Sequence, residues 1–281
     1  MSKPADIKLL PCALQEILNE LPPTLGVEEV YSHLENMPPH YWEALTKADL
    51  IFHLSTINEF FLRLAAGRDH GVTPVVRKRY FPKKGYTEVA VCTWDRKGLV
   101  SKIAGSLTCA ELNIKKACVY TRYDHVVLDI FRVDDSTGEH AMDNMQLRKV
   151  EAYLGQSLEA VAPLDLEMLL ENTVIKYNRQ KWISAVKKQA PAITIEWDHH
   201  HTGEYTGLKI EAPDTQGLLF TVMDELSIQQ LNIHFSEIET LRKKAIDHFF
   251  LTDRYGRKLI DTDQRTSIEG SIRSRVTRLY S

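Results

Sequence analysis

The sequence lacks the features that mark membrane, secreted and strongly charged proteins. No apolar run approaches the roughly 20 residues that a membrane-spanning helix needs, and the opening residues MSKPADIKLL contain no signal-peptide core. The formal net charge of the 281 residues is −3, which gives no reason to expect nucleic acid or an anionic membrane as a partner. We therefore expect a cytoplasmic protein that binds neither.

Cysteine is scarce, and its spacing favours neither a zinc site nor a disulfide framework. The four cysteines form no C-x-x-C pair, and three of them stand in apolar segments, so we expect reduced, packed thiols. Cys92 and Cys118 are expected on neighbouring strands of one sheet, as packed thiols and not as a nucleophile.

Helical spacing dominates the first part of the chain. Residues 5–66 show apolar positions at helical spacing, interrupted by Pro22-Pro23 and Pro38-Pro39. The segment GRDHGVTP (67–74) has the Gly and Pro content of a linker. The length suits about two domains. We predict a helical segment over 1–70, domains over 73–160 and 192–281, and a connecting helix over 161–191.

The two predicted domains repeat the same pattern. TEVAVCTWDRKGLVSKIAGSL (87–107) matches TGLKIEAPDTQGLLFTVMDEL (206–226), and each copy continues through Leu-Asn-Ile into further strands and a closing helix. Asn in Leu-Asn-Ile is expected to take the left-handed conformation that ends a helix. Met145 is expected on the apolar face of the first closing helix. Each copy thus reads β-α-β-β-α, with an extra hairpin strand in front.

The repeated D-x-x-G-L turn has the chemistry of an anion-binding helix start. Asp95 and Asp214 can accept hydrogen bonds from the first helix amides. Gly98 and Gly217 let the backbone bend sharply and let a ligand approach, and exposed amides there suit a carboxylate. The simpler alternative is a capped strand-to-helix turn without a ligand.

These segments resemble a known family. DRKGLVSKIAGSL, LNIKKACVYT and LDIF, with PDTQGLLFTV, LNIHFSEIET and IDHFF, are similar to two ACT domains, and NMPPHYW…LIFHL (36–54) resembles the stretch before them in the bifunctional uridylyltransferase/uridylyl-removing enzymes. The resemblance implies an α+β protein: two ferredoxin-like βαββαβ domains with antiparallel sheets, preceded by a helical segment.

The resemblance also implies which enzyme motifs to look for, and the sequence does not contain them. That family uses a Gly-Ser loop with D-x-D for nucleotidyl transfer and an HD domain for removal. No His precedes Asp, and the one D-x-D, Asp261 to Asp263, follows no Gly-Ser loop. We therefore expect a non-catalytic chain with no cofactor and no metal. A divergent uridylyltransferase, or a part of one, is the enzyme alternative.

By the same resemblance, an amino acid binds where ACT domains meet, and glutamine is the effector of the uridylyltransferase family. The family commonly has Pro before the turn glycine, where this chain has Lys97 and Gln216, so the turn gains φ freedom. The implied ligand-binding residues are Asp95, Arg96, Lys97, Gly98, Leu99, Asn113 and Ile114, with Asp214, Thr215, Gln216, Gly217, Leu218, Asn232 and Ile233.

Other conspicuous residues favour plainer interpretations. Adjacent side chains of the triplet His199 to His201 alternate on an extended chain, so they make a poor chelate. The basic hairpin (Arg77, Lys78, Arg79, Lys83 and Lys84) suits an exposed, alternately charged surface better than a phosphate patch. Asp129 and Asp247 stand in apolar strands, where a buried carboxyl needs a partner, and neither position alone indicates catalysis.

The leading hypothesis is a non-catalytic regulatory protein that senses an amino acid. Effector binding between the ACT copies would change their packing, and the N-terminal helices would pass that change to a protein partner. The alternative from another class is a scaffold that dimerises through ACT domains without a ligand. A homodimer is compatible with either.

Overall fold

A computed structural model describes residues 16–42, 45–67, 73–135, 141–159, 165, 192–198, 204–215, 217–241 and 244–280, without the side chains of 39 and 40. Its contacts divide the chain into two compact units. The N-terminal unit comprises 1–77, 90–95 and 120–128, and the C-terminal unit comprises 78–89, 96–119 and 129–281.

The N-terminal unit is built on the predicted helices. They are α2 (Val27–Asn36), the 3-10 turn η1 (Pro39–Trp42) and α3 (Lys47–Ala65). Thr46 caps α3 by accepting a hydrogen bond from the Asp49 amide, and the Asp49 carboxylate accepts one from the Thr46 amide. This capping box fixes where the helix begins. Apolar side chains of α2, α3 and the residues before α2 form one cluster: Ile17, Leu21, Leu25, Val30, Leu34, Leu50 and Leu54.

A buried polar chain ties these helices to the hairpin near residue 122. Tyr41 Oη lies 3.0 Å from His33 Nε2 and 2.8 Å from His53 Nδ1. Arg122 Nη1 lies 3.2 Å from His33 Nδ1, and the Tyr123 amide donates to the Asn36 carbonyl over 3.0 Å. Burial, and then the Arg122 charge, hold the pKa of His33 well below its usual value, which favours the neutral ring.

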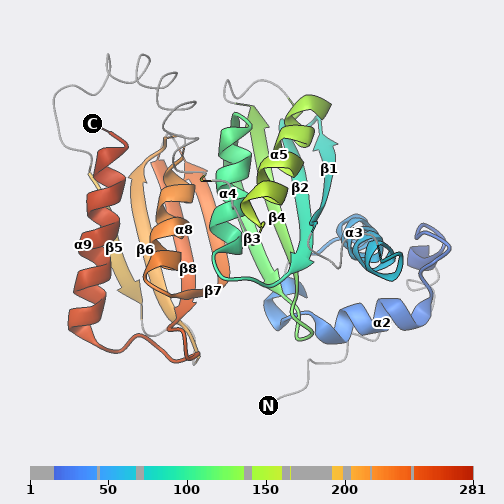
Figure 1. Cartoon of the computed structure of the whole chain (residues 1–281), viewed down its shortest axis with the longest axis horizontal. Helices are drawn as coiled ribbons and strands as arrows, with labels where there is room; N and C mark the ends of the chain where they lie inside the picture. Colours follow the sequence, from blue (N-terminus) through green and yellow to red (C-terminus); the bar gives the residue numbers. More distant parts are fainter. Residues whose placement is uncertain are drawn as a thin grey trace. The chain divides into compact units, whose positions relative to one another are not determined.

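Two four-stranded sheets repeat one topology. The first has the strand order β1-β2-β4-β3 and the second β5-β6-β8-β7, so in each copy the extra hairpin strand takes one edge (Figure 1). This confirms the predicted α+β fold with two ferredoxin-like antiparallel sheets. The strands are β1 Val75–Phe81, β2 Tyr86–Trp94, β3 Leu112–Thr121, β4 Val126–Asp135, β5 Thr194–Asp198, β6 Thr206–Pro213, β7 Asn232–Leu241 and β8 Lys244–Thr252.

Two helices cover one face of each sheet (Figure 1): α4 and α5 the first, α8 and α9 the second. Helix α4 packs against α5 and α8, and α8 packs against α9. The helical spacing of buried Leu99, Ile103 and Leu107 in α4 recurs as Leu218, Val222 and Leu226 in α8. The helices are α4 Leu99–Cys109, α5 Asn144–Ser157, α8 Leu218–Ile228 and α9 Thr262–Arg278.

Three details of the sequence prediction were wrong. The left-handed residues after α4 and α8 are Glu111 (φ 63°) and Gln230 (φ 59°), not the asparagines, because each helix ends before Leu-Asn-Ile and the next strand begins there. Strands β2 and β3 are not neighbours, since β4 lies between them, so Cys92 and Cys118 do not share adjacent strands. Met145 is 66% exposed, so it does not belong to the apolar face of α5.

Other predictions fall outside the described residues. The predicted connecting helix over 161–191 lies outside the described residues except for Asp165. The histidine triplet and Gln216 also lie outside them. Cys92 and Cys109 are buried, and Cys118 is half-buried. Of the helices that the structure describes, none is both long enough and apolar enough to cross a membrane.

Candidate functional site

The glycines of the two D-x-x-G-L turns have similar backbone conformations. Gly98 (φ 70°) and Gly217 (φ 86°) are left-handed residues at the N-cap positions of α4 and α8, a conformation that strongly favours glycine. The expectation that Asp95 and Asp214 accept hydrogen bonds from the first helix amides stays a prediction, and the Asp214 side chain is half-buried.

Each turn glycine faces the end of the other copy's first helix, but at different distances. A Cβ atom on Gly98 would lie 2.8 Å from Ser227 Oγ, whereas a Cβ on Gly217 would lie 4.0 Å from Thr108 Cγ2. Thr108 and Ser227 occupy equivalent places in the repeat, each five residues before the asparagine of Leu-Asn-Ile. The two turns occupy equivalent places in the repeat. Ser227 lies closer to Gly98 of the first turn than Thr108 lies to Gly217 of the second.

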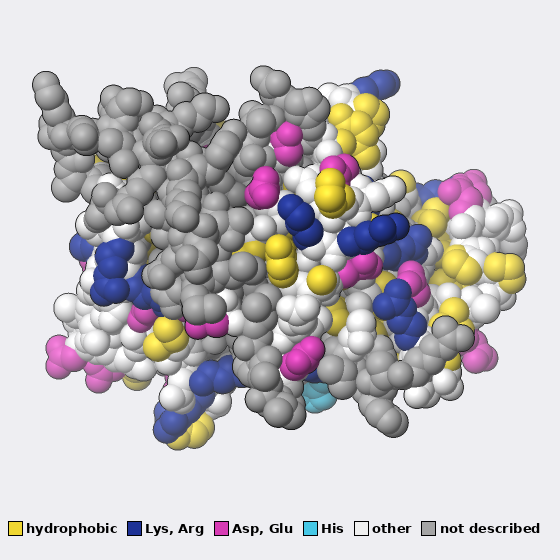
Figure 2. Space-filling model, turned by 45° about the horizontal axis from the view of Figure 1, so that its top comes forward, with side chains coloured by type: hydrophobic (Ala, Val, Ile, Leu, Met, Phe, Trp, Pro, Cys, Tyr) yellow, Lys and Arg dark blue, Asp and Glu magenta, His cyan; other side chains and the backbone are white. Residues whose placement is uncertain are grey.

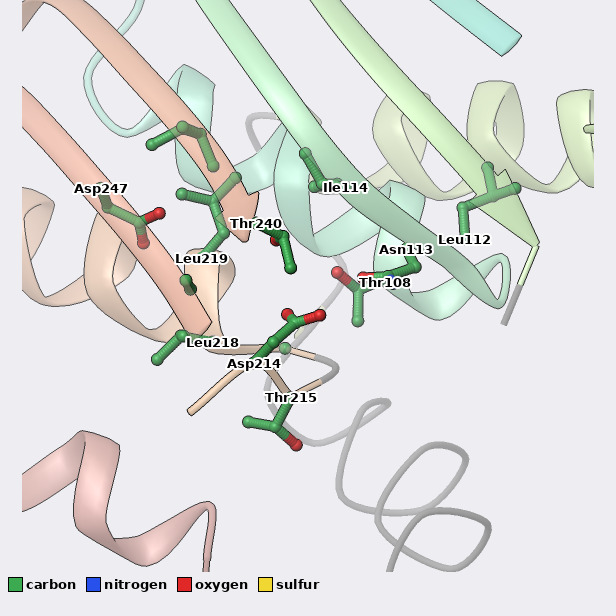
Figure 3. Close-up of a pocket in the computed structure, with 13 residues that line it drawn as sticks. Thr108, Leu112, Asn113, Ile114, Asp214, Thr215, Leu218, Leu219, Thr240 and Asp247 are labelled. Carbon is green, nitrogen blue, oxygen red and sulfur yellow. The ribbon is translucent and has the colours of Figure 1, made fainter. Parts of the chain in front are cut away.

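The second turn borders a pocket built from both copies. The first copy contributes the end of α4 and the start of β3, and the second copy contributes the turn, the start of α8 and parts of β7 and β8 (Figure 3). The pocket and the solvent at its mouth together make about 360 Å³. Its lining residues are Thr108, Leu112, Asn113, Ile114, Asp214, Thr215, Gly217, Leu218, Leu219, Ile238, Thr240, Ala245 and Asp247.

Two carboxyl groups give the pocket its electrostatic character. Burial raises the pKa of Asp247 to about 8, and nearby Asp214 adds to that shift. Burial also raises the pKa of Asp214, while the Lys115 charge opposes the rise. Tyr280, whose hydroxyl donates to the Pro213 carbonyl over 2.5 Å, has its pKa raised by burial and then by the two carboxylates. The site combines acidic acceptors with the positive end of α8.

The predicted site residues fall into two groups. Asn113, Ile114, Asp214, Thr215, Gly217 and Leu218 line the pocket together. The first-turn residues Asp95, Arg96, Lys97, Gly98 and Leu99 do not line it, nor do Asn232 and Ile233. Lys97 is exposed, and Asn232 donates through Nδ2 to the Asp253 carbonyl over 3.0 Å. The repeat predicted two equivalent sites, whereas this pocket lies at the second turn.

Sequence reasoning missed several residues of the pocket. Thr108, Leu112, Leu219, Ile238, Thr240, Ala245 and Asp247 all line it. A signal existed for Asp247, because an acid inside an apolar strand is unusual. No comparable signal marks Thr108, since its place in the pocket depends on how α4 packs against α8.

The competing features have structural roles. Asp261 caps α9 by accepting from the Gln264 amide over 2.9 Å. In the basic hairpin, Arg79 pairs with the buried Glu88, and Arg132 Nε lies 3.4 Å from the same carboxylate. On the coloured right-hand part of the view in Figure 2, Lys and Arg side chains are interspersed with Asp and Glu. Among the described residues no group of three or more His, Cys, Asp or Glu is placed to hold a metal ion.

The curated proteins to which the chain is similar include enzymes of one name. No protein-family model matches the chain. It is 24% identical over 239 residues to the bifunctional uridylyltransferase/uridylyl-removing enzyme of Rhodospirillum rubrum, covering 85% of this chain and 24% of that enzyme. The enzyme of the same name from Azospirillum brasilense is 28% identical over 237 residues, with 84% and 24% covered. The chain thus spans about a quarter of the length of these relatives, and over most of its own length it resembles a region of the bifunctional uridylyltransferase/uridylyl-removing enzymes.

Proposed function

We propose that this chain is a non-catalytic regulatory region that binds an amino acid in the second-turn pocket, with glutamine as the first candidate effector. The observation that carries the proposal is the position of the pocket: it joins the D-x-x-G-L turn of one copy to the Asn-Ile pair of the other. A ligand bound there would contact both copies at once. Their relative packing would then depend on the ligand.

The resemblance supports a regulatory role in a general way. The relatives are named as enzymes, and this chain covers about a quarter of their length. The non-catalytic part of the proposal rests on the residues, since the one D-x-D of the sequence lies at the start of α9, where Asp261 caps the helix. We place this activity in the cytoplasm and propose that the N-terminal helices contact a protein partner.

Calorimetric titration of the whole chain with each common amino acid tests the proposal. We expect saturable heat and a thermal shift with one of them, glutamine being tried first. If no amino acid gives heat or a thermal shift, the sensor function is wrong. Saturable binding of a nucleoside triphosphate with Mg²⁺ would instead favour the enzyme alternative.

The repeat offers a matched pair of variants for this titration. Asn113 lines the pocket, while the equivalent Asn232 is exposed and bonds to the Asp253 carbonyl. Asn113→Ala should weaken amino-acid binding by about tenfold, because a lost hydrogen bond costs about 1 to 1.5 kcal/mol. Asn232→Ala should leave it unchanged. Equal effects of the two substitutions would place the ligand elsewhere.

A size measurement separates the sensor from the scaffold. A scaffold would keep one oligomeric state whether or not an amino acid is present, and it would bind none. A sensor is expected to bind the amino acid. Sedimentation with and without each amino acid therefore shows whether the oligomeric state stays fixed, as expected for a scaffold, or responds to a ligand, as a sensor could.

A further inference from the structure

Asp247 of β8 carries a deeply buried carboxyl group. It lies in β8, between Ile210 of β6 and Ile238 of β7 in the strand register, and is 1% exposed. Neither carboxyl oxygen has a hydrogen-bond partner among the described residues, although such a buried group normally costs free energy unless it is paired. Its side chain borders the pocket (Figure 3). The missing donor can therefore come from a ligand.

The groups around Asp247 do not supply that donor. The Tyr280 hydroxyl donates to the Pro213 carbonyl, and the Thr108 hydroxyl donates to the Ala104 carbonyl over 2.7 Å. Lys115 acts on Asp214 and lies 3.4 Å from the Asp134 carboxylate. Asp214 itself is a second acid on the pocket wall. Among its described lining residues, the pocket thus has two acids and no cation.

We propose that Asp247 and Asp214 bind the protonated primary amine of the effector. This inference rests on the proposed function and adds the orientation of the ligand: its ammonium lies at the two carboxyls and its carboxylate at the start of α8. A primary ammonium has three N–H donors, enough for both acids and a neighbouring oxygen. A divalent metal ion is a poorer match, because it takes six or more oxygen ligands and the described residues gather no group of three acids or histidines.

Binding of an ammonium ion would release a proton. The pKa of about 8 keeps Asp247 largely protonated at neutral pH while the pocket is empty. A cation beside it favours the carboxylate form, so the Asp247 proton passes to solvent as the ammonium binds. The charged and titratable groups facing Asp247 are Asp214 and Tyr280, with Lys115 beyond Asp214. Affinity should therefore rise with pH between neutrality and about pH 8.

Methylammonium tests the ammonium site without knowledge of the effector. Methylammonium chloride should raise the melting temperature of the whole chain by about 3 °C or more at a saturating concentration, and potassium chloride of equal ionic strength should not. Asp247→Asn should abolish the difference. Asp129→Asn changes the equivalent buried strand acid, which does not line the pocket, and should keep it. An equal shift with potassium, an equal shift in Asp247→Asn, or no shift at all overturns the proposal.

The amino acid that the titration identifies allows a second test of the ammonium site. Asp247→Asn should weaken its binding by about thirtyfold, as expected for a lost bond to a charged group. Calorimetry in two buffers of different ionisation enthalpy should show proton release in the wild type and none in Asp247→Asn. If the amino acid binds both proteins equally and releases no proton, the ammonium site is wrong while the sensor function stands. If no amino acid binds, the sensor function fails first.

Discussion

At the scale of single residues, Asp247 connects the pocket to the stability of the fold. An unfolded Asp titrates near pH 4, whereas burial raises the pKa of Asp247 to about 8 in the folded chain. Between these values the folded state holds a proton that the unfolded state has lost. Because stability falls with rising pH wherever the folded state binds more protons, Asp247 destabilises the chain increasingly from about pH 4 to about pH 8.

We predict that Asp247→Asn removes this dependence. The variant should be more stable than the wild type at pH 8 by about 2 to 4 kcal/mol and should lose this advantage near pH 5. Urea unfolding across this pH range measures the difference. Glu239→Gln, which changes an exposed acid of β7, is the control and should leave the slope unchanged. Parallel pH profiles of wild type and Asp247→Asn would show that Asp247 is ionised throughout.

At the scale of elements, the contact between α4 and α8 distinguishes the two turns. The left-handed conformation penalises any side chain at Gly98 or Gly217. At Gly98, a new Cβ also meets Ser227 Oγ at 2.8 Å, while at Gly217 the nearest atom is 4.0 Å away. A substitution by alanine therefore creates a steric clash at Gly98 but not at Gly217.

We predict that Gly98→Ala costs more stability than Gly217→Ala, and that Ser227→Ala restores part of the difference. The left-handed penalty alone is about 1–2 kcal/mol in each case. The additional cost at Gly98 should appear as coupling to Ser227 in a double-mutant cycle of unfolding free energies. A cycle without coupling would mean that the Ser227 side chain turns away at no cost.

Much of this architecture could be predicted from the repeat. The helix–strand order followed from periodicity, because Leu99, Ile103 and Leu107 keep helical spacing whatever the partner. The pocket could be predicted only in part. Asn113 and Asp214 belong to motifs, whereas the contribution of Thr108 depends on the packing of α4 against α8. Sequence alone cannot separate Thr108 from Ser227, since both are small hydroxyl residues in equivalent places.

At the scale of the whole molecule, one strand runs from the pocket to the buried polar chain. Asn113 and Ile114 lie at the start of strand β3 and line the pocket. Arg122 and Tyr123 directly follow the end of this strand. Arg122 contacts His33, and the Tyr123 amide bonds to the Asn36 carbonyl at the end of α2. If the effector restrains the start of β3, this strand is a physical route to the N-terminal helices.

Hydrogen exchange of the whole chain tests this route. With the bound amino acid at about a hundred times its Kd, amides at the second turn and at the start of β3 should exchange up to ~100-fold more slowly, because their opening then requires release of the ligand. We also expect slower exchange at the Tyr123 amide. Asn113→Ala at the same ligand concentration should reduce all three effects. Protection confined to the second turn would contradict a site shared by both copies, and an unchanged Tyr123 amide beside a protected pocket would rule out transmission through β3.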